Sequence, residues 1–176
     1  MEAHFVSPFL NERKPMRTEL AHSRPAEVLL AEDNDNDVEL TRLGFKRAKL
    51  LVNLHRVKDG AECLAFLRKQ GEYVNAPTPD LILLDLNMPK VGGREVLAAM
   101  LADERLKVLP VVVLTTSEQE EEVLKTYQMG CSSFIVKPID FEQFLRVVRA
   151  IGEYWFTIVV LPKAVSTENS PTPAGA

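Results

Sequence analysis

Four short runs of consecutive apolar residues constrain the fold of this chain more than any other feature. They lie at 28–31, 81–84, 111–114 and 134–136, and a weaker alternating segment lies at 53–57. A strand with one solvated face would alternate apolar and polar residues, so continuous runs indicate strands that are buried on both faces. Strands of that kind are typical of parallel sheets.

The segments that separate the runs repeat apolar residues at the spacing of a helix. These residues are Val38 and Phe45, Leu64 and Leu67, Val96 and Met100, Val123 and Tyr127, and last Phe144, Val148, Ile151 and Trp155. Two helix starts carry a capping residue three positions before an acid or amide, namely Ser117 before Glu120 and Asp140 before Gln143. The alternation of strands and helices predicts a doubly wound α/β sheet.

Composition and charge limit the functions open to this chain. Its 176 residues, the size of one domain, include 21 Lys and Arg against 25 Asp and Glu, so the net charge is −4. That balance disfavours binding to nucleic acid or to an anionic membrane surface. No apolar run approaches the roughly 20 residues that span a bilayer, so we expect a cytoplasmic protein. Cys63 and Cys131 are expected to be buried small side chains rather than disulfide or zinc ligands.

The two ends differ in composition from the rest of the chain. Residues 1–25 mix charges with prolines, and residues 162–176 are small, polar and proline-rich. We therefore predict an N-terminal extension at 1–25, a folded domain at 26–156, an apolar arm at 157–161 and a disordered tail at 162–176.

Polar residues follow four of the five predicted strands at the point where each strand ends. They are Glu32 and Asp33, then Asp85 with Asn87, then Thr115 and Thr116, and finally Lys137. The carboxyl ends of strands form the ligand crevice of an open α/β sheet. Carboxylates that lie so close together would repel one another unless a cation lay among them. Hard oxygen ligands of this kind suit Mg²⁺. A carboxylate beside a metal, a lysine and a hydroxyl is suited to accept a phosphoryl group.

At these residues the sequence resembles the receiver domain of bacterial two-component response regulators. The ordered set consists of Glu32 with Asp33, Asp85, Thr115 and Lys137 with Pro138. The resemblance covers about residues 26–156. It implies a flavodoxin-like, five-stranded parallel sheet in the order 2-1-3-4-5, with helices on both faces.

The resemblance also implies a role for each matching residue. Asp85 would accept a phosphoryl group from a phosphohistidine of a sensor histidine kinase or a histidine phosphotransfer protein. Mg²⁺ would be held by Asp33, by Asp85, by the backbone carbonyl of Asn87 and, through a water, by Glu32. Lys137 would hold a phosphoryl oxygen and Thr115 would close on it.

Two further features follow from the same resemblance. The rotamer of Phe134 would follow the movement of Thr115, and the peptide bond between Lys137 and Pro138 would be cis.

Several positions keep a second interpretation. Thr116 could be the reactive hydroxyl in place of Thr115, and Phe134 could be an ordinary core residue. Asp35 and Asp37 are interpreted as charges that favour the N-terminus of a helix, not as site residues.

The apolar residues at the end of the folded domain and in the arm after it indicate how the chain assembles and which kinase it is paired with. The apolar residues Trp155, Phe156, Ile158, Val160 and Leu161 extend past the last helix and are predicted to form a homodimer arm, the alternative being an arm folded over its own sheet. This pattern of aromatic and aliphatic residues is similar to that of single-domain regulators of bacterial and cyanobacterial phytochrome kinases. The stretch after Trp155 is too short for a helix-turn-helix domain, so we expect signalling by protein contact or phosphorelay.

A phosphoryl-accepting switch that turns over no separate substrate has three rival functions, and each would need other residues than those present. An aspartyl-phosphate phosphatase would carry a second aspartate at the position of Asn87. A nucleotide switch would need a glycine-rich phosphate loop where Asp33 stands. A scaffold that is never phosphorylated is the third rival, and the complete set of acids, Thr115 and Lys137 argues against it.

Overall fold

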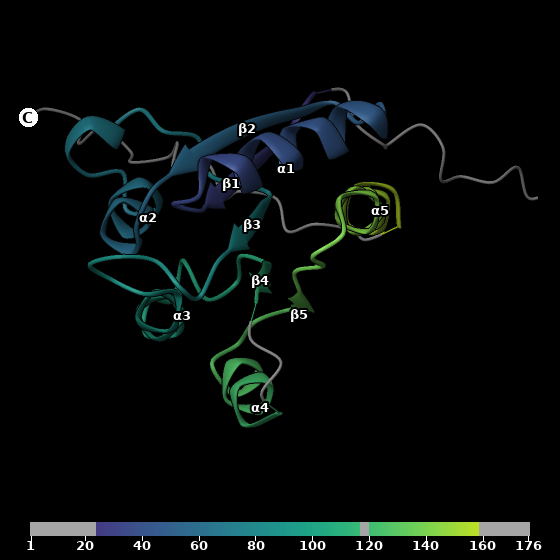
Figure 1. Ribbon diagram of the computed structural model, residues 1–176. Coiled ribbons are helices and arrows are strands. Elements are labelled where there is room, and N and C mark those ends of the chain that lie inside the picture. The colour runs from purple at the N-terminus through teal and green to yellow at the C-terminus, as the bar shows by residue number, and fades with distance from the viewer. Residues whose placement is uncertain (1–23, 117–119, 159–176) are drawn as a thin grey trace, which may run out of the picture.

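The computed structural model describes residues 24–116 and 120–158 (Figure 1). Within them lies one five-stranded parallel sheet in the order β2-β1-β3-β4-β5, which confirms the predicted fold class and strand order. The strands are β1 (Ala26–Ala31), β2 (Val52–Val57), β3 (Leu81–Leu84), β4 (Val111–Thr115) and β5 (Ser133–Val136). Each continuous apolar run is therefore a strand, as predicted.

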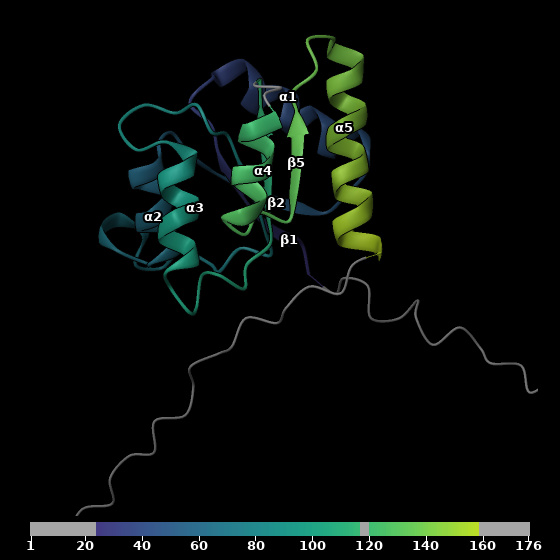
Figure 2. The same ribbon diagram turned by 90° about the horizontal axis from the view of Figure 1, so that it is seen from below.

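Helices cover both faces of the sheet. They are α1 (Asp35–Arg47), α2 (Gly60–Leu67), α3 (Gly93–Leu101), α4 (Glu120–Gln128) and α5 (Phe141–Glu153), with shorter turns at Gly71–Tyr73 and Tyr154–Ile158. Figures 1 and 2 show α1 and α5 on one face and α2 and α3 on the other, with α4 beside β5. Among the described residues, no helix is both long and apolar enough to cross a membrane.

Short polar side chains cap the starts of three of these helices, α1, α2 and α5. The Asn34 side chain accepts hydrogen bonds from the N–H groups of Asn36 and Asp37 at the start of α1. The predicted cap of α5 is confirmed, because the Asp140 carboxylate accepts from the N–H of Gln143 at 2.8 Å. The other predicted cap, at Ser117, lies outside the described residues.

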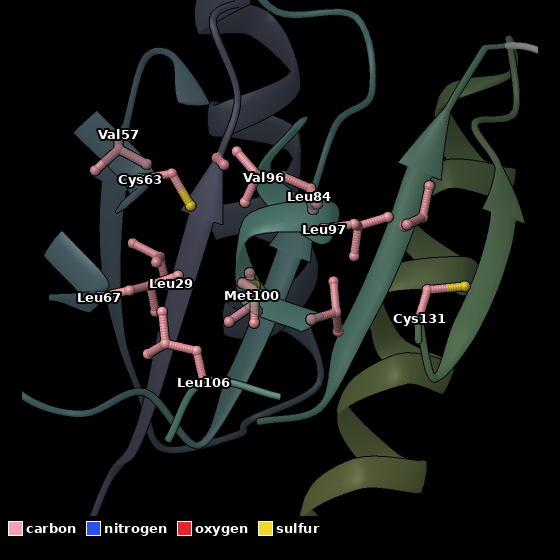
Figure 3. Packing of buried hydrophobic residues seen from close by; sticks show 14 of the residues in the cluster. Leu29, Val57, Cys63, Leu67, Leu84, Val96, Leu97, Met100, Leu106 and Cys131 are labelled. Atoms are coloured by element: carbon pink, nitrogen blue, oxygen red, sulfur yellow. The ribbon is translucent and has the colours of Figure 1, made fainter. Parts of the chain in front are cut away.

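Alternate residues of each buried strand face two separate hydrophobic cores. On β1, Leu29 and Ala31 face the core under α2 and α3, whereas Val28 and Leu30 face the core under α1 and α5. Figure 3 shows the first of these cores, which includes Cys63. Cys63 and Cys131 are buried and free, as predicted, and burial raises the pKa of the Cys63 thiol to about 12.

The predicted dimer arm is wrong for its first two residues. Trp155 and Phe156 are only 9% and 5% exposed, because a wider helical turn after α5 carries them into the core under α1. Phe156 lies 6.5 Å from Phe45, measured between ring centroids. These two residues therefore complete the domain's own core, which was the alternative interpretation.

The structure describes only small parts of the apolar arm and of the N-terminal extension. The backbone of Ile158 belongs to the last helical turn, and Val160 and Leu161 lie outside the described residues. At the other end, Arg24 forms a 2.7 Å ion pair with Asp80, whose carboxylate also accepts from the N–H of Glu27. Arg24, the first described residue, is thus held next to the start of β1.

Candidate functional site

The polar residues that follow the strands lie together at the carboxyl edge of the sheet. Glu32 and Asp33 follow β1, Asp85 follows β3, and one carboxylate oxygen of each lies within 4.8 Å of the others. Glu32 and Asp85 are buried, and Asp33 is exposed. The sheet order explains the cluster, because β3 pairs directly with β1 although 50 residues of chain separate Ala31 from Ile82.

The ammonium group of a lysine lies among these carboxylates. Lys137, which follows β5, donates from Nζ to Glu32 at 2.6 Å, to Asp85 at 2.8 Å and to Asp37 at 3.0 Å. Its side chain is 5% exposed. A buried charge of this kind is stable only when it is paired, and here all three ammonium donors have a carboxylate partner.

Burial and pairing shift the pKa values of two of these groups. Burial raises the pKa of the Glu32 carboxyl above its ordinary value, although the hydrogen bond from Lys137 acts in the opposite direction. Burial by itself would lower the pKa of Lys137, but hydrogen bonds to Asp85 and Glu32 outweigh it, and the pKa of this ammonium is raised. Lys137 therefore keeps its positive charge at neutral pH.

Asp37 belongs to this cluster although the sequence interpretation assigned it to the helix start. It lies in the first turn of α1, as expected, but its carboxylate also binds Lys137 and is 25% exposed. The available signal in the sequence was its place in the first turn of the helix that follows Glu32 and Asp33.

The loop between β1 and α1 is held by a cation that sequence reasoning also missed. Arg56, near the end of β2, donates to the backbone carbonyls of Glu32 and Asp33 at 3.1 and 2.9 Å. It also forms a 2.6 Å ion pair with Asp35. Its position at the end of the second predicted strand was the available signal, since β2 and β1 are neighbours in the sheet.

The segment after β3 connects Asp85 to the hydroxyl at the end of β4. The N–H of Asn87 donates to Asp85 Oδ1 at 3.0 Å, and Asn87 Nδ2 lies 3.3 Å from Thr115 Oγ1. Thr115 is fully buried, whereas Thr116 is exposed. The structure therefore brings Thr115 to the cluster.

Phe134 lies on β5, the strand next to the one that ends in Thr115. It is partly buried and packs against the core under α2 and α3, and its N–H donates to the Tyr127 hydroxyl at 3.2 Å. In the sheet it pairs with Val113, two residues before Thr115. This position accommodates both the switch role and the ordinary core role.

The expected cis peptide bond at Pro138 is not present. The described residues contain no cis peptide bond, so the bond between Lys137 and Pro138 is trans. The trans isomer is the lower in energy for such bonds by about 0.5–1 kcal/mol. From this backbone the Lys137 ammonium already reaches its three carboxylates, so the geometry of the cluster does not require the cis isomer.

The donor atoms of the cluster fit a divalent cation. Glu32, Asp33 and Asp85 offer only hard carboxylate oxygens, and the ammonium of Lys137 neutralises a single negative charge among them. A hard divalent ion that keeps some of its waters takes one or two carboxylates in such a site. The arrangement can therefore place a cation beside the carboxylate of Asp85.

Comparisons with known proteins agree with this geometry. A sequence model described as the response regulator receiver domain matches residues 28–149. Response regulator Rcp1 of Synechocystis sp. (strain ATCC 27184 / PCC 6803 / Kazusa) is 41% identical over 140 residues, which cover 80% of this chain and 95% of that protein.

Solved structures lead to the same family. The phosphorylated cyanobacterial phytochrome response regulator RcpA superposes with a TM-score of 0.77 at 40% identity, covering 80% of this chain and all of that one. The Mn²⁺-bound form of Rcp1 gives a TM-score of 0.76 at 40% identity, covering 79% of this chain and all of that one. The chain therefore belongs to the response regulator receiver family of two-component signalling and is related to phytochrome response regulators.

Proposed function

We propose that this protein is a switch that accepts a phosphoryl group on Asp85 in a Mg²⁺-dependent reaction. The observation that carries the proposal is the place of Asp85, a buried carboxylate bound by Lys137 Nζ at 2.8 Å and grouped with Glu32 and Asp33. The donor would be a phosphohistidine of a sensor histidine kinase or of a histidine phosphotransfer protein. A phytochrome kinase is the favoured source, because RcpA is a phytochrome response regulator.

The reaction forms a bond between an Asp85 carboxylate oxygen and phosphorus and breaks the bond from phosphorus to the histidine nitrogen. Asp33, Asp85 and the Asn87 carbonyl would hold Mg²⁺, with Glu32 acting through a water. When bound, the cation neutralises charge on the transferring phosphoryl oxygens. Lys137 would then exchange a carboxylate partner for a phosphoryl oxygen, and Thr115 would turn its hydroxyl to another.

The output would be a change in protein contacts. A phosphoryl group adds about 1.5 to 2 negative charges, if phosphoaspartate resembles other phosphoresidues. To change a surface from mostly off to mostly on, phosphorylation must favour the second state by about 5.5 kcal/mol. We propose that Thr115, followed by Phe134, carries this preference to the surface formed by α4, β5 and α5.

We also propose a homodimer and a cytoplasmic location. The homodimer would use the turn after α5, where Tyr154 is 50% exposed, together with Ile158, Val160 and Leu161. Free, buried Cys63 and Cys131 fit a reducing compartment. Light scattering across a range of protein concentrations, with and without acetyl phosphate, tests the homodimer; a monomeric mass throughout would contradict it.

Intact mass after incubation with acetyl phosphate tests the central proposal. With Mg²⁺, the wild-type protein should gain the mass of one phosphoryl group. The gain should disappear without Mg²⁺, and also in Asp85→Asn, because the amide removes the nucleophilic carboxylate. If neither acetyl phosphate nor a cognate kinase adds a phosphoryl group, the protein is a scaffold, not a switch.

A further inference from the structure

The loop between β3 and α3, residues 86–92, carries Asn87 and is fixed at the end next to Asp85. Gly93 begins α3 so close to the Asp85 carbonyl that a β-carbon there would overlap it, and the Gly93 N–H donates to the Leu86 carbonyl at 3.1 Å. This end of the loop therefore follows the backbone of β3 with little freedom.

The far end of the same loop is fastened to the start of α2. Lys90 Nζ forms a 2.5 Å ion pair with Asp59, the N-cap of α2, and the N–H of Gly60 donates to the Val91 carbonyl at 2.9 Å. A side chain at Gly60 would overlap that carbonyl, so the approach of the two backbones requires glycine. Lys90 itself has φ +61°, a strained value that surrounding contacts must hold in place.

The ion pair between Asp59 and Lys90 differs from an ordinary surface pair. The Asp59 side chain is only 2% exposed, and both of its oxygens are used, because Oδ1 accepts from the Glu62 N–H at 2.9 Å while Oδ2 binds Lys90. The Lys90 side chain is 70% exposed. Loss of the lysine would leave a buried carboxylate with backbone N–H partners and no counter-charge, whereas loss of an exposed pair costs little.

We propose that Asp59 and Lys90 are positioning residues for the phosphorylation site. They hold the β3–α3 loop so that Asn87 stays within hydrogen-bond reach of Asp85 and Thr115 and its backbone carbonyl is available to the cation. This role rests on the proposed function, since it assumes that Mg²⁺ binds beside Asp85. Neither residue of the pair belongs to the cluster that could hold the cation.

The test compares Lys90→Met and Lys90→Arg with the wild-type protein. Lys107→Met is the control, because Lys107 forms an ion pair at 2.6 Å with the exposed carboxylate of Glu104 and lies outside the loop. The first measurement is the Mg²⁺ dissociation constant by calorimetric titration. We expect Lys90→Met to weaken Mg²⁺ binding about tenfold, as for other groups that orient metal ligands. Lys90→Arg should restore most of it, and Lys107→Met should not change it.

The second measurement is amide hydrogen exchange without Mg²⁺ or phosphoryl donor. At a temperature where both variants remain folded, the Gly60 N–H, bonded to the Val91 carbonyl, and the Asn87 N–H should exchange severalfold faster in Lys90→Met than in Lys107→Met. Unchanged exchange at both amides would overturn the positioning role. Equal Mg²⁺ affinity of Lys90→Met and wild type would overturn it as well. Failure of wild-type protein to bind Mg²⁺ would instead refute the proposed function.

Discussion

At the scale of single residues, Lys137 decides the charge balance of the site. Its ammonium has three carboxylate partners, and the contact with Asp37 is both the longest, at 3.0 Å, and the most exposed. In the proposed reaction, Lys137 would have to release one partner to bind a phosphoryl oxygen. The contact with Asp37 is the least costly to release, because water can replace it.

Asp37→Asn tests this exchange. The amide keeps an acceptor oxygen for Lys137 but removes one negative charge from the rim of the site. Phosphorylation by acetyl phosphate at saturating Mg²⁺ should become about two- to fivefold faster, since the removed repulsion is worth about 0.5–1 kcal/mol at a partly exposed position. The rate is followed by intact mass. A slower rate would mean that Asp37 is needed to orient Lys137.

At the scale of elements, the site depends on where helices start against the sheet. Asp59 both caps α2 and binds the loop after β3, so one carboxylate serves helix and site. On the opposite face, Gly44 of α1 allows α5 to approach, because a β-carbon there would lie 2.6 Å from Val148 Cγ1. Small residues at such contacts set the distance between elements.

The stability contributed by Asp59 should depend on pH. The hydrogen bonds from Lys90 and from the Glu62 N–H hold the pKa of Asp59 below its ordinary value of 3.8. A carboxyl with a lowered folded-state pKa contributes stability above the unfolded pKa, and this contribution is lost as the pH falls through the folded pKa. Asp59→Asn, which keeps a helix cap, should therefore be less stable than wild type at pH 7 but similar to it well below pH 4.

Urea unfolding between pH 7 and pH 3 measures this difference. Asp140→Asn is the matched control, because Asp140 caps α5 in the same way, accepts from Gln143, and is exposed. Its difference from wild type should be smaller at pH 7. A difference for Asp59→Asn that stays constant over the whole range would show that the ion pair contributes no stability.

At the scale of the whole molecule, the turn after α5 closes the domain. Trp155 and Phe156 fill the core between α1 and α5, so the folded unit extends past the end of the matched family segment at residue 149. The proposed dimer contacts would thus lie directly after residues that belong to the domain's own core.

Phe156→Ala should lower the free energy of unfolding by about 3–5 kcal/mol, the usual cost of removing a buried aromatic ring. The loss should be the same at protein concentrations tenfold apart, because the ring packs within one chain. Tyr154→Ala, at a half-exposed position that contacts Trp155, should cost less than about 1.5 kcal/mol. A loss of stability in Phe156→Ala that depends on protein concentration would instead indicate that Phe156 packs in a dimer interface.

The sequence by itself determined the strands, the helices and the main acids of the site. Burial of a strand on both faces leaves a local pattern, and the bounds of β3 agree with its apolar run. The order of Glu32, Asp33, Asp85 and Lys137 along the chain was sufficient to predict their meeting, because parallel strands end at one edge.

Only the tertiary structure decided which side chains support these acids. The contacts of Arg56 with the β1–α1 loop and of Lys90 with Asp59 join segments that are more than 20 residues apart in the chain. Burial of Trp155 likewise depends on how closely α5 approaches α1. These outcomes are set by distances between packed elements, and periodicity along a chain carries no information about such distances.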